Sequence, residues 1–269
     1  MPAFWKNTST LDRLVPALQE TVDPAEAEWA VLGSRPMPDL DAFPRLQGIF
    51  KCGIGTDNVP FEAAAERGIR VCLPGPETAA VIHRETAHFA VSLILRMLYS
   101  RVGDLDRWEK SPRPALTERT VLVVGTGNIG GRVAAALKPF LRVLTYDSAH
   151  DAPAVLREAL PQADVVSLHV PLTRDTRGLV DPAWLTSMKD GAALVNTARG
   201  PLVDEQALLA ELKSGRLSAA FDVFWQEPYN GPLRALHPFP FFMTPHVAST
   251  CQAFLDGLAR DLNQCLTHA

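Results

Sequence analysis

Short apolar runs alternate with amphipathic segments along most of the chain. Near the N-terminus three such runs, Trp29–Gly33, Gly48–Gly53 and Ile69–Leu73, have the length and composition of buried strands. The segment Pro60–Gly68 predicts a helix between the last two, because a proline begins it and a glycine ends it. Strands that alternate with helices indicate βα units and a parallel sheet.

A longer helix is predicted from Glu85 to Arg101. Its apolar residues recur at helical spacing, with others beside the main stripe: Ala87, Ala90, Val91, Ile94, Leu95 and Leu98. Such a helix is buried on more than one side. A polar, proline-containing segment, 103–119, then separates the two halves of the chain.

The second half repeats strand and helix regularly. The predicted strands are 120–124, 142–147, 163–170, 192–198 and 217–223, and the predicted helices are 128–137, 153–160, 182–188 and 205–215. The first, third and last strands are nearly continuous apolar runs, which is typical of strands covered on both faces. The amphipathic tail 251–266 is expected to fold back onto the N-terminal half. We therefore predict a doubly wound α/β domain over 82–248 and a second domain built from 1–81 and 249–269.

The turn after the strand 120–124 has the spacing G-x-G-x-x-G. Gly125 permits a tight turn, Gly127 lets the backbone approach a pyrophosphate, and Gly130 lets helix and strand pack closely. Glycines are common in turns, so the alternative is a turn that binds nothing. The apolar strand before it and the helix after it favour a dinucleotide site, with phosphates at the helix N-terminus.

Asp147 ends the second strand, where a carboxylate would accept hydrogen bonds from the adenosine ribose. Its alternative role is that of an ordinary turn aspartate. No arginine or lysine follows immediately, so a 2′-phosphate would meet repulsion without a basic partner. The sequence therefore predicts NAD rather than NADP as the cofactor.

Composition narrows the remaining function classes. The 269 residues are 47% apolar and 21% charged, with a net charge of −4, which gives no footprint for nucleic acid or an anionic membrane surface. The N-terminus lacks the pattern of a signal peptide, and the most apolar helical stretch is too short to span a bilayer. The four cysteines show no metal-ligand spacing and lie in apolar surroundings. We expect reduced thiols, no metal and a cytoplasmic location.

Three polar clusters fall where predicted strands end, at 196–200, 221–228 and 244–246. They bring an arginine, a carboxylate and a histidine to one edge of the sheet: Arg199, Glu227 and His246. In an open α/β sheet ligands bind beyond the carboxyl ends of the strands. Each residue alone has a structural alternative: a surface ion pair, a solvated loop position, or a histidine that satisfies a backbone carbonyl.

Five stretches together resemble the D-isomer-specific 2-hydroxyacid dehydrogenase family, especially its phosphoglycerate dehydrogenase branch. In chain order they read "GIGTDNVPFEAAAERGIRV", "GTGNIGGRVA", "ADVVSLHVPLTRDTRGLV", "NTARGPLVDEQALLAELKSGRLSAAFDVFWQEP" and "TPHVAST". The resemblance implies a Rossmann-type NAD domain inserted in a smaller, flavodoxin-like α/β substrate domain. It also implies hydride exchange between NAD(H) and C2 of a 2-hydroxy or 2-oxo acid.

The resemblance implies roles for individual residues. His246 would be the general acid and base, Glu227 would orient it and favour its protonated form, and Arg199 would bind the substrate carboxylate and carbonyl. Backbone N–H groups of Gly53, Ile54 and Gly55 would hold the same carboxylate, and Asp222 would contact the nicotinamide carboxamide. The cofactor cleft would be lined by Gly125, Gly127, Asn128, Ile129, Gly130, Asp147, Val170, Pro171, Thr176, Thr197 and Ala198.

Alternatives and departures accompany this resemblance. The chain would instead be an NAD(H)-sensing regulatory or scaffold protein if it bound cofactor without turnover. A formate or phosphite enzyme is disfavoured, since formate enzymes of the family carry glutamine in place of Glu227. His169 is the rival histidine, for which we expect a structural or cofactor-lining role.

The chain is short for the family, and we expect it to lack the strand–helix unit that opens the substrate domain. The resemblance also implies a homodimer formed through the cofactor domains.

Overall fold

The computed structural model describes residues 2–12, 19–100, 102–104 and 106–267. The chain forms two compact units, each described by itself below. Met1–His83 and Ser249–Ala269 make up the small unit, and Arg84–Ala248 makes up the large unit.

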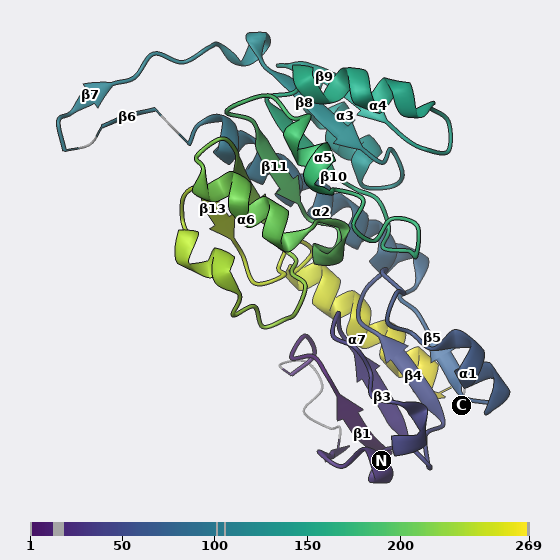
Figure 1. The fold of residues 1–269 in the computed structure, drawn as a ribbon. Coiled ribbons are helices and arrows are strands. Elements are labelled where there is room, and N and C mark those ends of the chain that lie inside the picture. The colour runs from purple at the N-terminus through teal and green to yellow at the C-terminus, as the bar shows by residue number, and fades with distance from the viewer. Residues whose placement is uncertain (1, 13–18, 101, 105, 268–269) are drawn as a thin grey trace. The chain divides into compact units, whose positions relative to one another are not determined.

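The small unit is a parallel sheet of five strands in the order β2-β1-β3-β4-β5 (Figure 1). The strands are β1 (Ala3–Lys6), β2 (Gln19–Glu20), β3 (Trp29–Leu32), β4 (Gly48–Lys51) and β5 (Arg70–Cys72). The predicted helix between β4 and β5 is confirmed as α1 (Phe61–Glu66). In chain order this sheet runs 2-1-3-4-5, the order of flavodoxin-like folds.

One expectation about the N-terminus is wrong. A leading strand is present, because β1 pairs with β3 through Phe4, Trp5 and Lys6. The residues after it, 13–18, lie outside the described part of the chain. The expected loss of the following helix is therefore not addressed by the structure.

The C-terminal helix α7 (Gln252–Thr267) covers one face of the small sheet. Its buried residues Phe254, Leu258 and Leu262 pack with Phe4 and Phe50 of the strands. The predicted return of the tail onto the N-terminal half is thus confirmed, and its amphipathic stripe is the contact surface.

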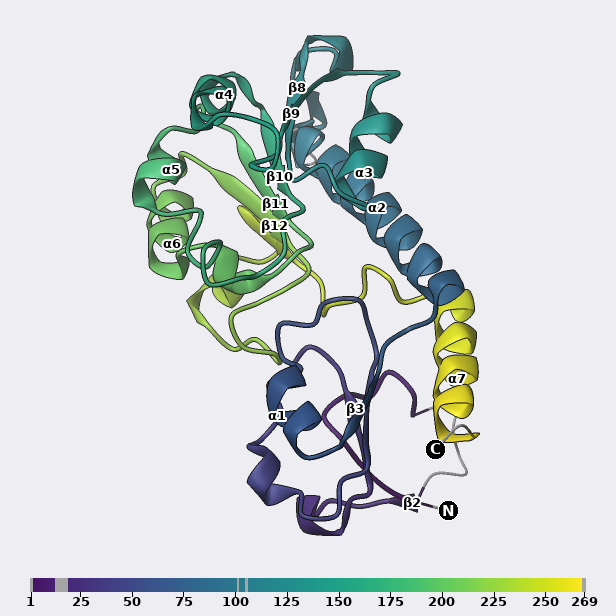
Figure 2. The same ribbon diagram turned by 90° about the vertical axis from the view of Figure 1, so that its right-hand side faces the viewer.

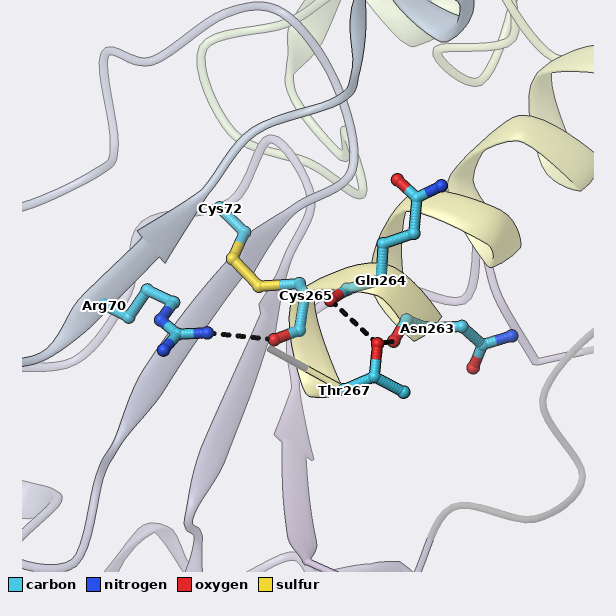
Figure 3. Close-up of a disulfide and its surroundings, with 6 residues drawn as sticks. All are labelled: Arg70, Cys72, Asn263, Gln264, Cys265 and Thr267. Atoms are coloured by element: carbon cyan, nitrogen blue, oxygen red, sulfur yellow. Dashed lines mark hydrogen bonds between the residues drawn. A yellow bond between two sulfur atoms is a disulfide. The ribbon is translucent and has the colours of Figure 1, made fainter. Parts of the chain in front are cut away.

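A disulfide joins Cys72, at the end of β5, to Cys265 in the last turn of α7 (Figure 3). Arg70 Nη1 donates a hydrogen bond to the Cys265 carbonyl at 3.2 Å, beside the same link. The prediction of four reduced thiols is therefore wrong for this pair, while Cys52 and Cys251 are free. The two partners lie 193 residues apart, so local spacing gives no sign of the bond.

Burial raises the pKa of the Cys52 thiol to about 12, which leaves it unreactive near neutral pH.

The large unit is a parallel sheet of six strands in the order β13-β12-β11-β10-β8-β9. The strands are β8 (Thr120–Val124), β9 (Arg142–Tyr146), β10 (Val165–Leu168), β11 (Ala193–Asn196), β12 (Ser218–Phe221) and β13 (Phe241–Met243). All of the strands predicted in this half are confirmed, and β13 is an additional one. The strand order reverses between β8 and β10, and ligands of doubly wound sheets bind at such a reversal.

Helices cover both faces of the large sheet (Figure 2). One face is packed by α2 (Pro76–Leu98) and α3 (Gly130–Leu137), and the other by α4 (Pro153–Ala159), α5 (Pro182–Thr186) and α6 (Glu205–Lys213). Helix α2 begins earlier than the predicted Glu85, at Pro76, a residue suited to the first helical turn. β8 is buried along its whole length, as expected for a strand covered on both faces.

A buried ion cluster ties the amino ends of the strands together. The Asp164 side chain is 8% exposed and accepts from Arg119 Nη1 at 2.9 Å, from Lys189 Nζ at 2.8 Å and from Thr120 N at 2.8 Å. Burial alone would raise the pKa of this carboxyl, but the three donors outweigh it and lower the pKa. The cluster lies at the end of the sheet opposite the predicted site and is a structural feature.

Candidate active site

The glycine turn connects β8 to α3, as predicted, and its glycines meet different demands. Gly125 has φ +90°, and a Cβ there would approach the His169 carbonyl oxygen to 2.6 Å. A Cβ on Gly130 would collide with the Gly125 carbonyl. A Cβ on Gly127 would meet no heavy atom within 4 Å among the described residues. The fold therefore needs the first and third glycines, and the space beside Gly127 is open to a ligand.

The helix that follows the turn presents its N-terminus to the same space. The residue before it is Ile129, whose side chain cannot cap the helix and packs instead into the core beside α2. The Asn128 carbonyl accepts a hydrogen bond from Arg132 Nη1 at 2.5 Å. Within the first turn of α3, Gly131 N and Val133 N already donate to the Gly127 and Ile129 carbonyls at 3.0 Å each. A phosphate would therefore approach the glycine turn at the N-terminus of α3 and not these two N–H groups.

Asp147 follows β9 and is bound to the glycine turn. Its Oδ2 accepts from Thr126 N at 2.8 Å and from Thr126 Oγ1 at 2.9 Å, and its Oδ1 accepts from Ala149 N at 3.1 Å. The hydrogen bond from the Thr126 backbone is the main reason why the pKa of Asp147 is lowered. A carboxylate has about four acceptor positions, so roughly one remains for a ribose hydroxyl.

His169 lies under the glycine turn and not among the catalytic candidates. Its Nε2 is 2.9 Å from the hydroxyl of the fully buried Ser167, and its Cβ packs against Gly130. Burial lowers the pKa of His169 to about 4, so the ring is neutral at physiological pH. This supports the structural role expected for the rival histidine.

The loop after β10 begins beside the glycine turn. The Val170 side chain lies where it would contact a Cβ on Gly125 at 2.9 Å. Further along, Thr176 Oγ1 donates to the Pro171 carbonyl at 2.7 Å and accepts from Thr173 N at 2.8 Å. Thr176 therefore shapes this loop through its own backbone contacts, and its role toward a cofactor stays a prediction.

The loop after β11 carries Thr197, Ala198 and Arg199. Asn196 holds it: its Oδ1 accepts from Ala198 N at 3.0 Å and its Nδ2 donates to the Arg199 carbonyl at 2.8 Å. No role was predicted for Asn196 from the sequence, although an asparagine at a strand end commonly bonds the backbone that follows. Thr197 Oγ1 is buried and has no hydrogen-bond partner among the described residues. A buried hydroxyl without a partner is unfavourable, so Thr197 fits contact with a bound cofactor.

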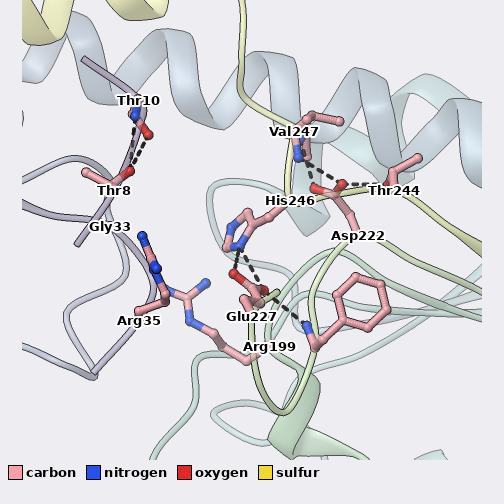
Figure 4. A network of polar contacts seen from close by, with 12 residues as sticks. Thr8, Thr10, Gly33, Arg35, Arg199, Asp222, Glu227, Thr244, His246 and Val247 are labelled. Atoms are coloured by element: carbon pink, nitrogen blue, oxygen red, sulfur yellow. Dashed lines mark hydrogen bonds and ion pairs between the residues drawn. The ribbon is translucent and has the colours of Figure 1, made fainter. Parts of the chain in front are cut away.

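His246 and Glu227 form a close pair (Figure 4). The imidazole Nδ1 lies 3.0 Å and 2.9 Å from the two carboxylate oxygens, and Phe224 N donates to Glu227 Oε1 at 3.1 Å. The two side chains are 33% and 18% exposed, so the pair is partly shielded from water. With Nδ1–H donating to the carboxylate, Nε2 is the ring atom left for a substrate.

Asp222 fixes the backbone that carries His246. Its carboxylate is fully buried and accepts from Thr244 Oγ1 at 2.6 Å, Val247 N at 2.9 Å and Ala248 N at 2.8 Å. Burial raises the pKa of Asp222, and these donors oppose the rise. His246 has φ +54°, a left-handed conformation that is costly for a residue with a Cβ and needs surrounding support. The three hydrogen bonds supply it.

Arg199 is drawn with Glu227 and His246 in Figure 4 and comes from the loop that follows β11. Its loop approaches the Glu227 loop closely, because a Cβ on the neighbouring Gly200 would collide with the Phe224 backbone. Arg199 Nη1 donates to the Ala198 carbonyl at 2.8 Å, which orients the guanidinium. The structure thus gathers the three predicted catalytic side chains at the carboxyl edge of one sheet.

The predicted substrate loop lies in the small unit, directly after β4. Gly53 has φ +156°, a conformation that favours glycine, and a Cβ there would meet nothing within 4 Å among the described residues. Its N–H and those of Ile54 and Gly55 follow the carboxyl end of a parallel strand, the usual position of a ligand site. Within the described part of the chain no group of His, Cys, Asp and Glu residues could hold a metal ion.

Comparisons with known proteins show which family the chain resembles. Residues 96–248 match the NAD binding domain of D-isomer specific 2-hydroxyacid dehydrogenases. The chain is 37% identical over 239 residues to a glyoxylate reductase of Thermofilum pendens, which covers 78% of this chain and 68% of that protein. It is 36% identical over 233 residues to a hydroxypyruvate reductase of Thermotoga maritima, covering 80% and 74%.

Solved structures show the same fold. D-lactate dehydrogenase from Aquifex aeolicus, complexed with NAD and lactic acid, superposes with a TM-score of 0.79 at 24% identity, covering 98% of this chain and 94% of that one. An NADPH-dependent glyoxylate/hydroxypyruvate reductase from Sinorhizobium meliloti, in complex with NADP and malonate, gives a TM-score of 0.74 at 27% identity, covering 96% and 90%.

Proposed function

Because the chain belongs to the D-isomer-specific 2-hydroxyacid dehydrogenase family, we propose that His246, Glu227 and Arg199 carry out the family's reaction. That reaction is hydride transfer between NAD(H) and C2 of a 2-hydroxy acid or its 2-oxo acid, so the protein is an NAD-dependent oxidoreductase. The alternative of a sensor without turnover is not favoured by these relatives. The observation that carries the residue assignment is the 2.9 Å contact between His246 Nδ1 and Glu227.

NADH, when bound, supplies the hydride that C2 of the 2-oxo acid receives. His246 Nε2 donates a proton to the former carbonyl oxygen, so that the C=O becomes CH–OH, and it takes the proton back in the oxidation. Glu227 accepts from Nδ1–H, which sets the tautomer and stabilises the imidazolium. Arg199 stays cationic throughout and holds the substrate carboxylate through paired hydrogen bonds.

The other predicted residues bind substrate or cofactor, or hold the catalytic loop. The N–H groups of Gly53, Ile54 and Gly55 bind the substrate carboxylate. The fit to a nicotinamide dinucleotide rests on two observations among the described residues: the open space beside Gly127 and the Thr197 hydroxyl, which has no hydrogen-bond partner there. Asp222 contributes by holding the His246 loop, and a contact with the nicotinamide carboxamide would be additional to its present bonds.

The substrates we propose are small 2-oxo acids such as glyoxylate and hydroxypyruvate, which give the two relatives their names. The test is NADH oxidation with glyoxylate, hydroxypyruvate, pyruvate and bulkier 2-oxo acids. We expect turnover to be highest with glyoxylate and hydroxypyruvate. Binding of NADH without turnover on any of them would favour the sensor alternative.

The variant His246→Ala tests the assigned acid and base. We expect turnover to fall by roughly 10²–10⁴-fold, the usual contribution of a positioned proton donor. NADH binding, followed by fluorescence, should be unchanged because the dinucleotide residues are untouched. His88→Ala is the matched control, since that side chain is 64% exposed on α2. Unaltered turnover in His246→Ala would remove this residue from the mechanism.

A homodimer is the proposed assembly. The ribbon formed by β6 (Gly103–Asp104) and β7 (Glu109–Lys110) extends away from the sheet of the large unit (Figure 1). Trp108 is 84% exposed and Val102 is 53% exposed on it. Two-stranded ribbons are marginal in water by themselves, so a second subunit is the partner that this ribbon suits. Sedimentation should give twice the 29.3 kDa chain mass, and Trp108→Glu should lower it.

The cytoplasm remains the proposed location. None of the described helices is long and apolar enough to cross a bilayer. The expected reduced thiols no longer support this location, because Cys72 and Cys265 form a disulfide and such bonds are uncommon in reducing compartments. Fractionation of the source cells, with the enzyme assayed in each fraction, tests this proposal.

A further inference from the structure

Lys51 is a buried lysine at the end of β4. The residue is 2% exposed, and all four residues of the strand are buried. Burying an ammonium group is costly unless hydrogen bonds replace its water. An apolar side chain would fill this position in β4 at a lower free-energy cost. The lysine therefore has a role other than packing.

The ammonium group belongs to a compact polar cluster. Lys51 Nζ donates to the Gly33 carbonyl and to Asn58 Oδ1, the latter at 2.8 Å. Asn58 Nδ2 donates to the Gly33 carbonyl at 2.9 Å and to the Arg35 carbonyl at 2.6 Å. The Asn7 side chain accepts from Gly33 N at 2.7 Å and donates to the Arg35 carbonyl at 2.8 Å.

These bonds join the loops that follow three neighbouring strands. Asn7 comes directly after β1 and Gly33 after β3, while Lys51 ends β4, next to the loop 52–60 that leads to α1. The carboxyl ends of parallel strands lie at one edge of the sheet, so the cluster braces the edge at which ligands bind. Two of its members are amides, which supply donors and acceptors for several backbone groups at once.

The loop 52–60 needs such a brace because its own conformation is permissive. Gly53 has φ +156° and no described heavy atom within 4 Å of a Cβ position, so neither a side chain nor close packing fixes it. A flexible loop loses conformational entropy when it orders around a ligand, and that loss weakens binding. Lys51 and Asn58 hold the loop at its two ends before a ligand arrives.

We propose that Lys51 is a positioning residue for substrate, which sets the N–H groups of residues 53–55 through its bonds to Gly33 and Asn58. This inference rests on the proposed function, which assigns those N–H groups to the substrate carboxylate. Lys51 acts through the loop and not by touching the reacting atoms. Its loss should therefore weaken substrate binding more than it slows the chemical step.

The test compares Lys51→Met with Lys6→Met in the full-length protein. Both variants remove a lysine from the end of a strand in the same sheet, but Lys6 is 28% exposed and pairs with Asp12 and Glu20. Oxamate, an unreactive 2-oxo acid analogue, is titrated by calorimetry into the NADH complex of each. The KM and kcat for glyoxylate are measured in parallel. Asn58→Ala repeats the comparison at a less buried member of the cluster, in case Lys51→Met does not fold.

We expect Lys51→Met to raise the oxamate Kd and the glyoxylate KM by about 10- to 100-fold, the cost of a misplaced binding group. The change in kcat should be smaller, and NADH affinity and Lys6→Met should stay within about twofold of wild type. Unchanged oxamate affinity in folded Lys51→Met and Asn58→Ala, with an active wild type, would overturn this inference alone. A wild type that neither binds oxamate nor turns over any 2-oxo acid would overturn the proposed function, and this inference with it.

Discussion

Replacement of Asp147 by asparagine should change the cofactor preference of the enzyme. The carboxylate is held by Thr126 and Ala149, and these bonds keep it ionised because they lower its pKa. Asparagine keeps an acceptor for Thr126 N but removes the negative charge. The variant therefore tests the charge with little change in the shape of the turn.

The magnitude follows from two effects. Two unit charges about 4 Å apart interact by about 1 kcal/mol in water and about 4 kcal/mol near a protein surface, and for this solvent-facing turn we take about 1–2 kcal/mol. The loss of a charge-assisted hydrogen bond to the ribose costs NADH about 1 kcal/mol more. Together, about 2–3 kcal/mol should reduce the NADH-to-NADPH ratio of kcat/KM by roughly 30- to 150-fold.

The assay is steady-state reduction of one 2-oxo acid with each cofactor at fixed ionic strength. Asp151→Asn is the matched control, because its carboxylate accepts from Asp147 N at 2.8 Å in the same turn. It removes the same charge and should leave the ratio within a few-fold of wild type. The reasoning is refuted if Asp147→Asn leaves the ratio unchanged, or if the control shifts it equally.

Three further predictions concern stability. Asp164→Asn should lower the free energy of unfolding by about 2 kcal/mol in urea titrations, with turnover kept, since two cations and a backbone N–H lose a buried partner. His169 is neutral when folded and takes up a proton when unfolded. Stability should therefore fall by at most about 3 kcal/mol between about pH 6.5 and pH 4, and His169→Gln should flatten that part of the curve. Reduction of Cys72–Cys265 should cost about 2–4 kcal/mol, and Cys72→Ser should match the reduced wild type in thermal melts.

The regular parts of the fold could be predicted from the sequence. Strands β8 and β10 of the large unit are nearly continuous apolar runs, and the helices of this unit keep a clear period, so local pattern and final structure coincide. β1 was missed because only Phe4 of its four residues is buried, which leaves no alternation to detect. The disulfide was missed because Cys72 and Cys265 meet only after α7 returns to the small sheet.

Some residues of the candidate site could likewise be predicted from the sequence, and others could not. Gly125, Gly127 and Gly130 could be found because their spacing encodes one continuous turn. Lys51 could not be assigned, since one partner, Gly33, follows a different strand and the other, Asn58, is brought to it only by the folding of its own loop. A single lysine in an apolar run was the one local sign. Such contacts depend on which strands are neighbours, and local sequence does not contain that order.

Asp222 illustrates how strand register positions His246, the proposed acid and base. β12 and β13 are paired so that Phe221 faces Met243, and the next residues, Asp222 and Thr244, therefore leave the sheet at the same level. A short carboxylate at that level can reach the N–H groups of Val247 and Ala248 in the neighbouring loop. Glu227, a few residues further along the β12 loop, then reaches the ring of His246. Both the backbone and the imidazole of His246 are thus fixed from the adjacent strand, so a change in the β12 loop should disturb catalysis as strongly as one beside His246.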